Sequence, residues 1–292
     1  MIEHKSYQIT FNTIYMIIAV IMFLPLILLF VASITDNNAL IANGYSFFPE
    51  RLSLEAYAYM ATNSSTILRA YTVTIVVTAL GTFIGLAITA MMSFALSITR
   101  LPGNRVISFF VFFTMLFNGG LVPSYILWTS LGIVNTIWAY VFPFLLTNAF
   151  SIILIRSYFV TNIPNELYES AKIDGAGYLR IFLQMAVPLG KPILATIGLF
   201  SCLLYWNDWL NGLYFITDPN LYSIQALLNR MSQNIQSVIS SATTMNNSGS
   251  MNLPQASIRM AIAFVAIVPI LVLYPFLQKY FADGIMRGAV KG

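Results

Sequence analysis

The sequence predicts an all-α, polytopic membrane protein that crosses the bilayer with six transmembrane helices. Its 292 residues are 58% hydrophobic and only 8% charged, and the mean hydropathy is +0.79. A water-soluble domain carries about 25% charged residues, which excludes an ordinary soluble domain. Six apolar stretches each approach the roughly 20 residues that a helix needs to cross a hydrocarbon core about 30 Å thick. Residues 1–292 are therefore expected to form one membrane domain, with no room for a soluble catalytic domain.

The six predicted spans follow one another through the whole chain. The first carries Pro25, a tolerated kink, and is followed by a poor match to a signal-peptide cleavage site, so it should stay as an anchor. The second is rich in small and hydroxyl residues, and Gly81-x-x-x-Gly85 would let another helix approach closely. The approximate spans are 11–33, 68–98, 106–128, 136–155, 193–216 and 258–278.

The third predicted span is interrupted near its outer end by Asn118-Gly119-Gly120 and Pro123. Broken backbone at membrane depth is tolerated where it faces protein or a water-filled cavity. Two interpretations stay open. The break either lines the transport path, with Asn118 facing the solute, or is a helix end capped by glycine.

The distribution of positive charge predicts the orientation, because cytoplasmic loops of membrane proteins are rich in Lys and Arg. With the N-terminus inside, ten of the 14 Lys and Arg side chains fall in the cytoplasm, and the four left outside are Arg51, Arg69, Arg230 and Arg259. Both termini are then cytoplasmic. The net charge of +4 reflects this topology, so a nucleic-acid partner is not needed to explain it.

The longest polar interruption on the predicted cytoplasmic side, residues 164–187, is expected to form a helix-turn-helix elbow in water. Leu167 and Ala171 stand four apart on one face of its first helix. Gly175 and Gly177 then allow the chain to leave that helix in a sharp turn. The second helix is expected to bury a stripe of side chains at helical spacing: Tyr178, Ile181, Phe182 and Met185. Pro188 is expected to break this helix.

This elbow resembles the EAA loop of ATP-binding-cassette (ABC) importer permeases, in which Glu-Ala-Ala is followed after three residues by Gly and later by an Ile-x-Leu-Pro-like close. Here Glu169-Ser170-Ala171 precedes Gly175, and Ala186-Val187-Pro188-Leu189 follows. Ser170 replaces the usual second Ala, a small-for-small change. In that family the elbow is the coupling helix, which sits in a groove of the cytoplasmic ATPase. The alternative is an ordinary amphipathic loop. The resemblance implies ATPase-coupling roles for Glu169, Ser170, Ala171, Asp174, Gly175 and Gly177.

The fifth predicted span contains an acidic side chain within Trp206-Asn207-Asp208-Trp209. A carboxylate at bilayer depth costs about 2.5–3.5 kcal/mol on insertion scales, so it normally faces a cavity or a partner. Aromatic faces beside amide and carboxylate groups suit a sugar, which makes Trp206, Asn207, Asp208 and Trp209, together with Asn118, candidates for a sugar path. The alternative is an interfacial tryptophan belt, with Asp208 snorkelling or paired to an arginine of a neighbouring helix.

The end of the chain, residues 278–292, resembles the carbohydrate branch of these permeases, specifically the G-type permease of the maltose importer. The Trp206-Asn207-Asp208 segment and residues 274–280 are similar to a subgroup that imports oligosaccharides from complex polysaccharides. The resemblance runs from the first span to the last residue. It implies that the predicted external loop, residues 217–255, reaches into a binding protein, and that the ATPase is approached by Arg287, Gly288, Lys291 and Gly292.

The same resemblance implies the partners. They are a second, F-type permease that completes a heterodimer, two cytoplasmic ATPase subunits, and an extracellular solute-binding protein. The high usage of Ile, Asn and Ser points separately to a low-GC bacterium, in which the binding protein would be a lipoprotein. ATP and Mg would then lie on the ATPase, and this chain would bind no cofactor and no metal. In the maltose system the sugar contacts within the membrane come mainly from the partner permease. The expected location is the plasma membrane of a bacterium.

Other classes of protein fit the residue inventory less well. His4, the single histidine, lies outside the predicted membrane segments, and Asp208 is the single carboxylate within them, so intramembrane serine and aspartyl proteases lack their catalytic groups. The single cysteine, Cys202, and His4 cannot form a Cys/His metal site. A receptor or structural membrane protein is the third possibility, and a stand-alone secondary transporter of a small polar solute is the better alternative. It needs no ATPase dock, whereas this chain has the elbow and lacks a phosphate-binding loop.

Overall fold

The computed structural model describes residues 3–98, 101–233 and 256–272. The chain divides into two compact units, the first made of residues 1–68 and 227–272 and the second of residues 69–226 and 273–292. The described part of the chain is helical, and its β-structure is one isolated bridge between Thr35 and Leu52. The predicted all-α class is therefore confirmed.

The helices occupy the hydrophobic runs that the sequence defines, with short helices between them. Their bounds are α1 (Glu3–Ser33), α2 (Asn37–Asn43), α3 (Glu55–Thr62), α4 (Ser64–Ser97), α5 (Asn104–Leu116), α6 (Leu121–Ser130), α7 (Trp138–Val141), α8 (Ala149–Asn162), α9 (Asn165–Ile173), α10 (Tyr178–Ile181), α11 (Val187–Leu189), α12 (Lys191–Trp206), α13 (Leu210–Phe215) and two further helices over 224–233 and 256–272. A π-helical segment, Phe182–Ala186, joins α10 to α11, and a 3₁₀ turn covers Pro219–Leu221.

Apolar helices of three kinds are found among the described residues. Two helices, α1 and α4, are long and apolar enough to cross a bilayer unaided. Two bent pairs reach that length together: α5 with α6, bent by 117°, and Tyr178–Leu189 with α12, bent by 84°. Two shorter apolar helices are α8 and Ala256–Val272. Each of the six overlaps one of the six predicted runs, but α8 extends seven residues beyond its run and Tyr178–Leu189 precedes the fifth run. Residues 273–278 of the last run lie outside the described residues.

In the first unit, α1 contacts the helix Ala256–Val272 and the segment that links α1 to α4. The rings of Phe30 and Phe264 lie 5.0 Å apart. Asp36 begins α2 by accepting hydrogen bonds from the backbone N–H groups of Asn38 and Ala39, as a helix N-cap should. The predicted external connection between the first two spans is therefore folded into α2 and α3.

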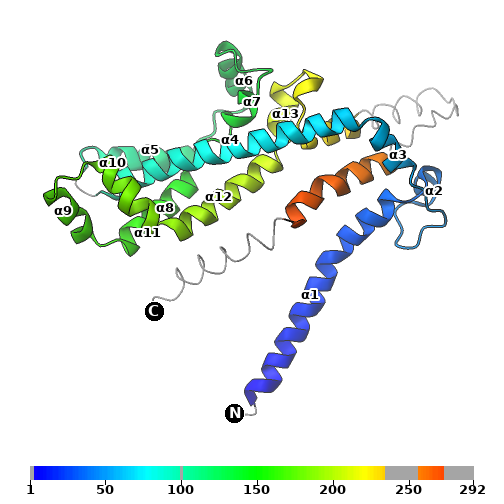
Figure 1. The fold of residues 1–292 in the computed structure, drawn as a ribbon, viewed down its shortest axis with the longest axis horizontal. Coiled ribbons are helices and arrows are strands. Elements are labelled where there is room, and N and C mark those ends of the chain that lie inside the picture. The colour runs from blue at the N-terminus through cyan, green and yellow to red at the C-terminus, as the bar shows by residue number, and fades with distance from the viewer. Residues whose placement is uncertain (1–2, 99–100, 234–255, 273–292) are drawn as a thin grey trace. The chain divides into compact units, whose positions relative to one another are not determined.

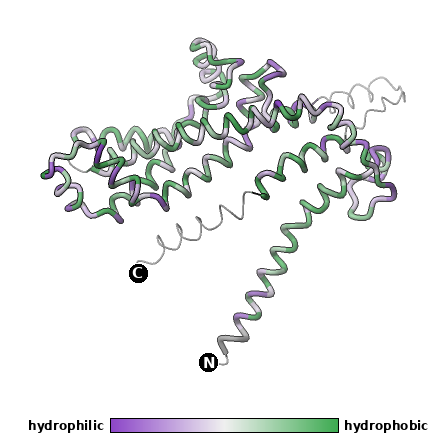
Figure 2. Tube along the Cα trace, viewed as in Figure 1, coloured by the Kyte–Doolittle hydropathy of each residue, from purple (hydrophilic) through white to green (hydrophobic). Residues whose placement is uncertain are grey.

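In the second unit, α4 and α12 lie side by side, and α5 and α8 pack beside them (Figure 1). The helix pair α9 and α10 lies at one end of this unit. Figure 2 shows hydrophobic residues along α4 and α12 and hydrophilic residues gathered on α9. This distribution is expected for helices in the bilayer joined to an elbow in water.

Small residues on α4 allow the close packing that the Gly81-x-x-x-Gly85 pattern predicts. A Cβ atom on Gly81 would lie 2.4 Å from the Tyr205 ring of α12, and one on Gly85 would lie 2.7 Å from the carbonyl oxygen of Leu146. The Tyr205 hydroxyl then donates a 2.9 Å hydrogen bond to the carbonyl of Val141. These glycines thus bring α4 against both α12 and the segment before α8.

The third run is interrupted where its glycines predicted, and the fourth run differs from the continuous helix predicted for it. The break in the third run is a helix end: α5 stops at Leu116, Asn118 Oδ1 accepts from the N–H of Gly120, and Gly120 has a φ of +88°. In the fourth run the long helix begins at Ala149 and not at Thr136. Asn148 caps α8 through the N–H groups of its first turn, and Pro143 lies in the irregular segment that precedes it.

Candidate functional site

The first helix of the elbow, α9, packs one face against the core of the second unit. Tyr168 and Ala171 are buried there, in one cluster with Phe94 of α4 and Phe159 of α8. The rings of Phe94 and Tyr168 meet edge to face with centroids 5.8 Å apart. Leu167, which was predicted to share the buried face with Ala171, is 36% exposed. The buried face instead contains Tyr168, three residues before Ala171, because side chains three apart also lie on one face of a helix.

The predicted coupling residues divide between this core and the surface. Ala171 is buried, and its small side chain lets α9 lie close to α4 and α8. The other five are exposed on α9 and on the turn that follows it: Glu169, Ser170, Asp174, Gly175 and Gly177. Ile173 joins them, with 86% of its surface exposed. The sequence analysis did not single out Ile173. An apolar residue that lies off the buried face, at the end of a polar helix, could have indicated a contact with a partner.

The turn of the elbow has the backbone that glycine provides. Gly175 has a φ of +79°, the left-handed conformation with which the chain makes the predicted sharp turn. Its N–H donates to the carbonyl of Lys172 (3.0 Å), and the N–H of Ala176 donates to the carbonyl of Ala171 (2.9 Å). These two bonds form a Schellman motif, which satisfies the last carbonyls of α9. Apart from its neighbours in the chain, no residue of the described part lies within 4 Å of a Cβ built on Gly175, so its backbone conformation is what requires glycine here.

The second helix of the elbow buries less of its predicted stripe than expected. Ile181 and Phe182 are buried, but Tyr178 is 51% exposed. The Tyr178 hydroxyl accepts a 2.7 Å hydrogen bond from Lys172 Nζ, which also lies 4.2 Å from the centre of the ring. Tyr178 therefore joins the two helices of the elbow at the surface, an arrangement that apolar spacing cannot reveal.

The end of the elbow also differs from the prediction that Pro188 breaks the helix. The helix continues through Leu189, and the sharp bend falls at Gly190. A Cβ atom on Gly190 would lie 2.6 Å from the Phe159 ring and 2.8 Å from the carbonyl oxygen of Ala186. The bend thus lies where the chain passes close to α8, and glycine leaves space for that contact.

Tyr168 carries a buried hydroxyl with no hydrogen-bond partner in the described part of the chain, and burial raises its pKa to about 12. Tyr168→Phe removes a polar group whose burial costs about 1–3 kcal/mol when unpaired, so we expect equal or higher thermal stability. Because the folded-state pKa lies above the ordinary value of 10.0, the wild type should also lose stability above that pH as the unfolded chain deprotonates. The Tyr168→Phe variant should not show this loss of stability at high pH.

The matched control for Tyr168→Phe is Tyr205→Phe, which removes the bonded hydroxyl at Val141 and should lower the melting temperature. Thermal unfolding of both purified variants at pH 7.5 and pH 10.5 tests the pair. Equal destabilisation by both substitutions would contradict the assignment of Tyr168 as unpaired.

The acidic residue of the fifth run begins a short helix. Asp208 is 7% exposed, and its Oδ1 accepts from the backbone N–H groups of Leu210 and Asn211 at 3.1 Å. Its Oδ2 accepts from the side-chain amide of Asn211 at 2.8 Å. In the part of the chain that the structure describes, no Lys or Arg is recorded as an ion-pair partner of Asp208. The carboxylate is therefore held by amides, as a cap of α13.

The other residues of that cluster take different positions. Trp206 is buried at the end of α12, and Trp209 is 46% exposed. Asn207 ends α12, and its Nδ2 donates to the carbonyl of Leu203 at 2.9 Å. The structure therefore does not direct these side chains to one common surface. The residues predicted to approach the ATPase, Arg287, Gly288, Lys291 and Gly292, lie outside the described residues.

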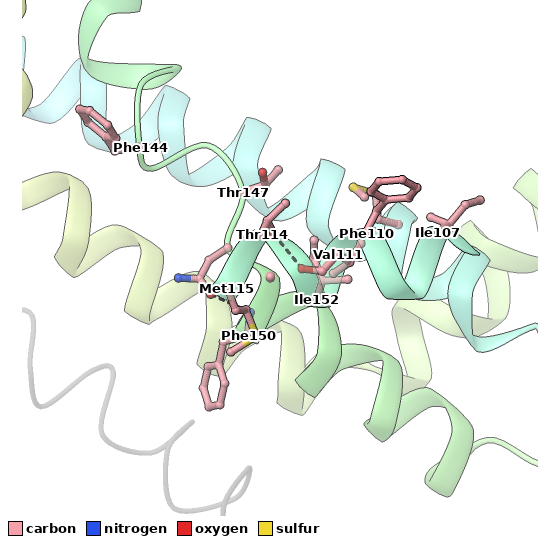
Figure 3. Close-up of a pocket in the computed structure, with 12 residues that line it drawn as sticks. Ile107, Phe110, Val111, Thr114, Met115, Phe144, Thr147, Phe150 and Ile152 are labelled. Atoms are coloured by element: carbon pink, nitrogen blue, oxygen red, sulfur yellow. Dashed lines mark hydrogen bonds between the residues drawn. The ribbon is translucent and has the colours of Figure 1, made fainter. Parts of the chain in front are cut away.

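An open cavity of about 650 Å³ lies between α4, α5 and α8, a volume within the usual range for small-molecule sites. Figure 3 shows Phe144 at one end of it, on the irregular segment before α8. Aromatic, aliphatic and uncharged polar side chains line the cavity: Met92, Ile107, Phe110, Val111, Thr114, Met115, Phe144, Thr147, Asn148, Ala149, Phe150 and Ile152. Rings beside hydroxyl and amide groups fit the C–H faces and hydroxyls of a sugar.

None of the predicted sugar-path residues lines this cavity within the described chain. Asn118 is engaged in the turn after α5, and the segment from Trp206 to Trp209 lies at α12 and α13. The sequence did carry a signal for the cavity wall: Pro143 and Asn148 interrupt an otherwise apolar run, and Asn before an apolar helix is a typical N-cap.

An all-helical membrane fold with a solvent-exposed elbow defines the class of a transporter permease. The chain belongs to the family described as binding-protein-dependent transport system inner membrane component, which it matches over residues 56–287. It is a membrane permease component of a binding-protein-dependent ABC importer, a transport subunit rather than an enzyme. Membership of this family implies an ATPase and a solute-binding protein as partners.

Relatives and a solved structure agree along nearly the whole chain. The chain is 36% identical over 274 residues to the polygalacturonan/rhamnogalacturonan transport system permease protein YtcP of Bacillus subtilis, covering 94% of each. It is 35% identical to protein LplC of the same organism, covering 94% of this chain and 91% of LplC. A bacterial ABC transporter involved in the import of the acidic polysaccharide alginate matches with a TM-score of 0.78 and 29% identity, covering 95% of this chain and 97% of the other.

Proposed function

We propose that the elbow of this permease is the element that couples a cytoplasmic ATPase to alternating access in the membrane. The observation that carries the proposal is the division of α9 into two faces. Tyr168 and Ala171 pack into the core formed with α4 and α8, while Glu169, Ser170 and Ile173 are exposed. A force applied to the exposed face would therefore be passed to two membrane helices through direct packing contacts.

The remaining partners and the orientation complete this proposal. The chain pairs with a second permease, two ATPase subunits bind the elbows of the two permeases, and a lipoprotein presents the solute outside. The elbow and both termini are cytoplasmic, as the excess of Lys and Arg on that side supports. ATP and Mg bind to the ATPase subunits, and this chain binds no cofactor.

The substrate we propose is an oligosaccharide that contains sugar acids. Support comes from two similar proteins, a permease for polygalacturonan and rhamnogalacturonan and an importer of the acidic polysaccharide alginate. The cavity residues supply the uncharged contacts that such a chain of sugar rings needs. In the described part of the cavity no lining residue is basic, so we assign the recognition of carboxylates to the binding protein and the second permease.

Purification of the tagged chain from its native membrane tests these assignments. We expect an ATPase and a second permease to copurify, and the ATPase activity in proteoliposomes to rise when binding protein and oligogalacturonides are added. A neutral malto-oligosaccharide of equal length is the control and should stimulate less. A chain that purifies alone and accumulates solute from an ion gradient without ATP would instead support a stand-alone secondary transporter.

A further inference from the structure

The irregular segment between α7 and α8 is held in place at two of its backbone carbonyls. The Val141 carbonyl accepts from the Tyr205 hydroxyl at 2.9 Å, and the Pro143 carbonyl accepts from the Asn211 side chain at 3.0 Å. Both donors are buried. Irregular backbone within a membrane run is tolerated where protein satisfies its polar groups or where it lines a cavity, and this segment does both.

A strained turn lies at the centre of this segment. The N–H of Leu145 donates to the carbonyl of Pro143 at 2.7 Å, which closes a γ-turn around Phe144. Phe144 has a φ of +62°, a conformation that is rare and strained for a bulky residue. Such strain persists where the surroundings impose it, and it is found most often at functional sites. The hydrogen bond from Asn211 to Pro143 is one restraint that imposes it.

The side chain of Asn211 is itself fixed by Asp208. Asn211 is 1% exposed, and its Nδ2 group donates both to Asp208 Oδ2 (2.8 Å) and to the Pro143 carbonyl (3.0 Å). Two N–H donors on one amide nitrogen serve these two acceptors. The carboxylate of Asp208 therefore orients the amide that holds the γ-turn.

The γ-turn determines where the ring of Phe144 lies. The centre of the ring lies 6.0 Å from the centre of the Phe215 ring of α13, which is fully buried. Phe144 itself is 45% exposed and belongs to the cavity wall. Thr147 and Asn148, with polar side chains, line the same wall close to it in sequence. The ring is thus supported by Phe215 and about half exposed at one end of the cavity, whose wall also carries polar side chains that can bond to hydroxyls.

We propose that Phe144 is the surface on which a sugar ring stacks in the cavity of this chain, and that Asp208 and Asn211 are positioning residues that hold it there. The proposal rests on the carbohydrate transport assigned above, and it deepens that assignment by naming where this subunit contacts its solute. Asp208 thereby acts on the sugar without touching it, which neither of the two interpretations drawn from the sequence included.

Sugar uptake and ATPase activity of the reconstituted transporter test the proposal together. Phe144→Leu keeps an apolar side chain in the strained turn but removes the aromatic face. Loss of the aromatic ring should raise the KM for oligosaccharide uptake roughly three- to tenfold, as expected for one aromatic contact. Stimulation of the ATPase by binding protein should be retained. Phe144→Tyr keeps the face and should retain the wild-type KM. An unchanged KM for Phe144→Leu would overturn the stacking role.

The positioning role is tested by combining substitutions. Asp208→Asn and Asn211→Ala should each raise the KM in the same direction, and each should add little when combined with Phe144→Leu, because all act through one ring. Fully additive effects would overturn the relay, as would an assembled Asp208→Asn complex with wild-type KM. A transporter whose ATPase is not stimulated by any oligosaccharide, in wild type and variants alike, would instead contradict the proposed coupling function.

Discussion

Replacing Gly81 with valine is expected to leave little assembled permease in the membrane. The Cβ of any larger residue would lie 2.4 Å from the Tyr205 ring, which is itself buried and hydrogen-bonded to Val141. The ring cannot move without giving up that bond. Overpacking of this kind costs about 1–3 kcal/mol and occasionally more, and loss of the hydrogen bond adds about 1 kcal/mol.

The measurement is the yield and melting temperature of the detergent-solubilised complex. Ala79→Val, which adds two methyl groups at an exposed position of α4, is the control and should behave as wild type. Gly81→Ala combined with Tyr205→Leu should recover part of the yield lost by Gly81→Ala, because the smaller side chain frees the space. Wild-type yield for Gly81→Val would show that α4 and α12 do not meet at this point.

Local patterns predicted the parts of the fold that depend on neighbours in the sequence. The helical runs follow from hydropathy, and the approach of α4 to α12 follows from the Gly81 and Gly85 spacing. The positive φ of Gly175 follows from its place just after a helix end. Each of these needs a window of only a few residues, so the sequence carries the signal in one place.

The structural features that could not be predicted from the sequence depend on contacts between distant segments. The bond between Asn211 and Pro143 joins residues 68 positions apart. Pro143 and Asn148 indicate an interruption of the apolar run around Phe144, but nothing local in the sequence indicates this partner. The buried face of α9 shows a smaller error of the same kind. Rotation by one residue, from Leu167 to Tyr168, is decided by the aromatic cluster around Phe94, which periodicity alone does not contain.

The largest effect on transport is expected from Gly175→Val in the elbow. Gly175 closes α9 with a φ of +79° and donates the bond to Lys172 that completes the Schellman motif. A β-branched residue is a genuine outlier at positive φ, so the valine chain must open this turn and redirect α10. We expect transport to be lost, with the ATPase either poorly bound or no longer stimulated by binding protein.

Gly177→Val is the matched control, since it places the same side chain two residues further on. Gly177 has a φ of −71° and a ψ of 160°, which valine adopts readily, and open space surrounds a Cβ at both positions. The two variants therefore differ in backbone conformation and hardly in contacts within this chain.

Oligosaccharide uptake and binding-protein-stimulated ATPase activity should stay near wild type for Gly177→Val. Both activities should fall at least tenfold for Gly175→Val, which corresponds to about 1.4 kcal/mol of lost coupling. Equal activity of both variants would mean that the shape of this turn does not transmit ATPase motion, and the coupling role would then have to be carried by another part of the chain.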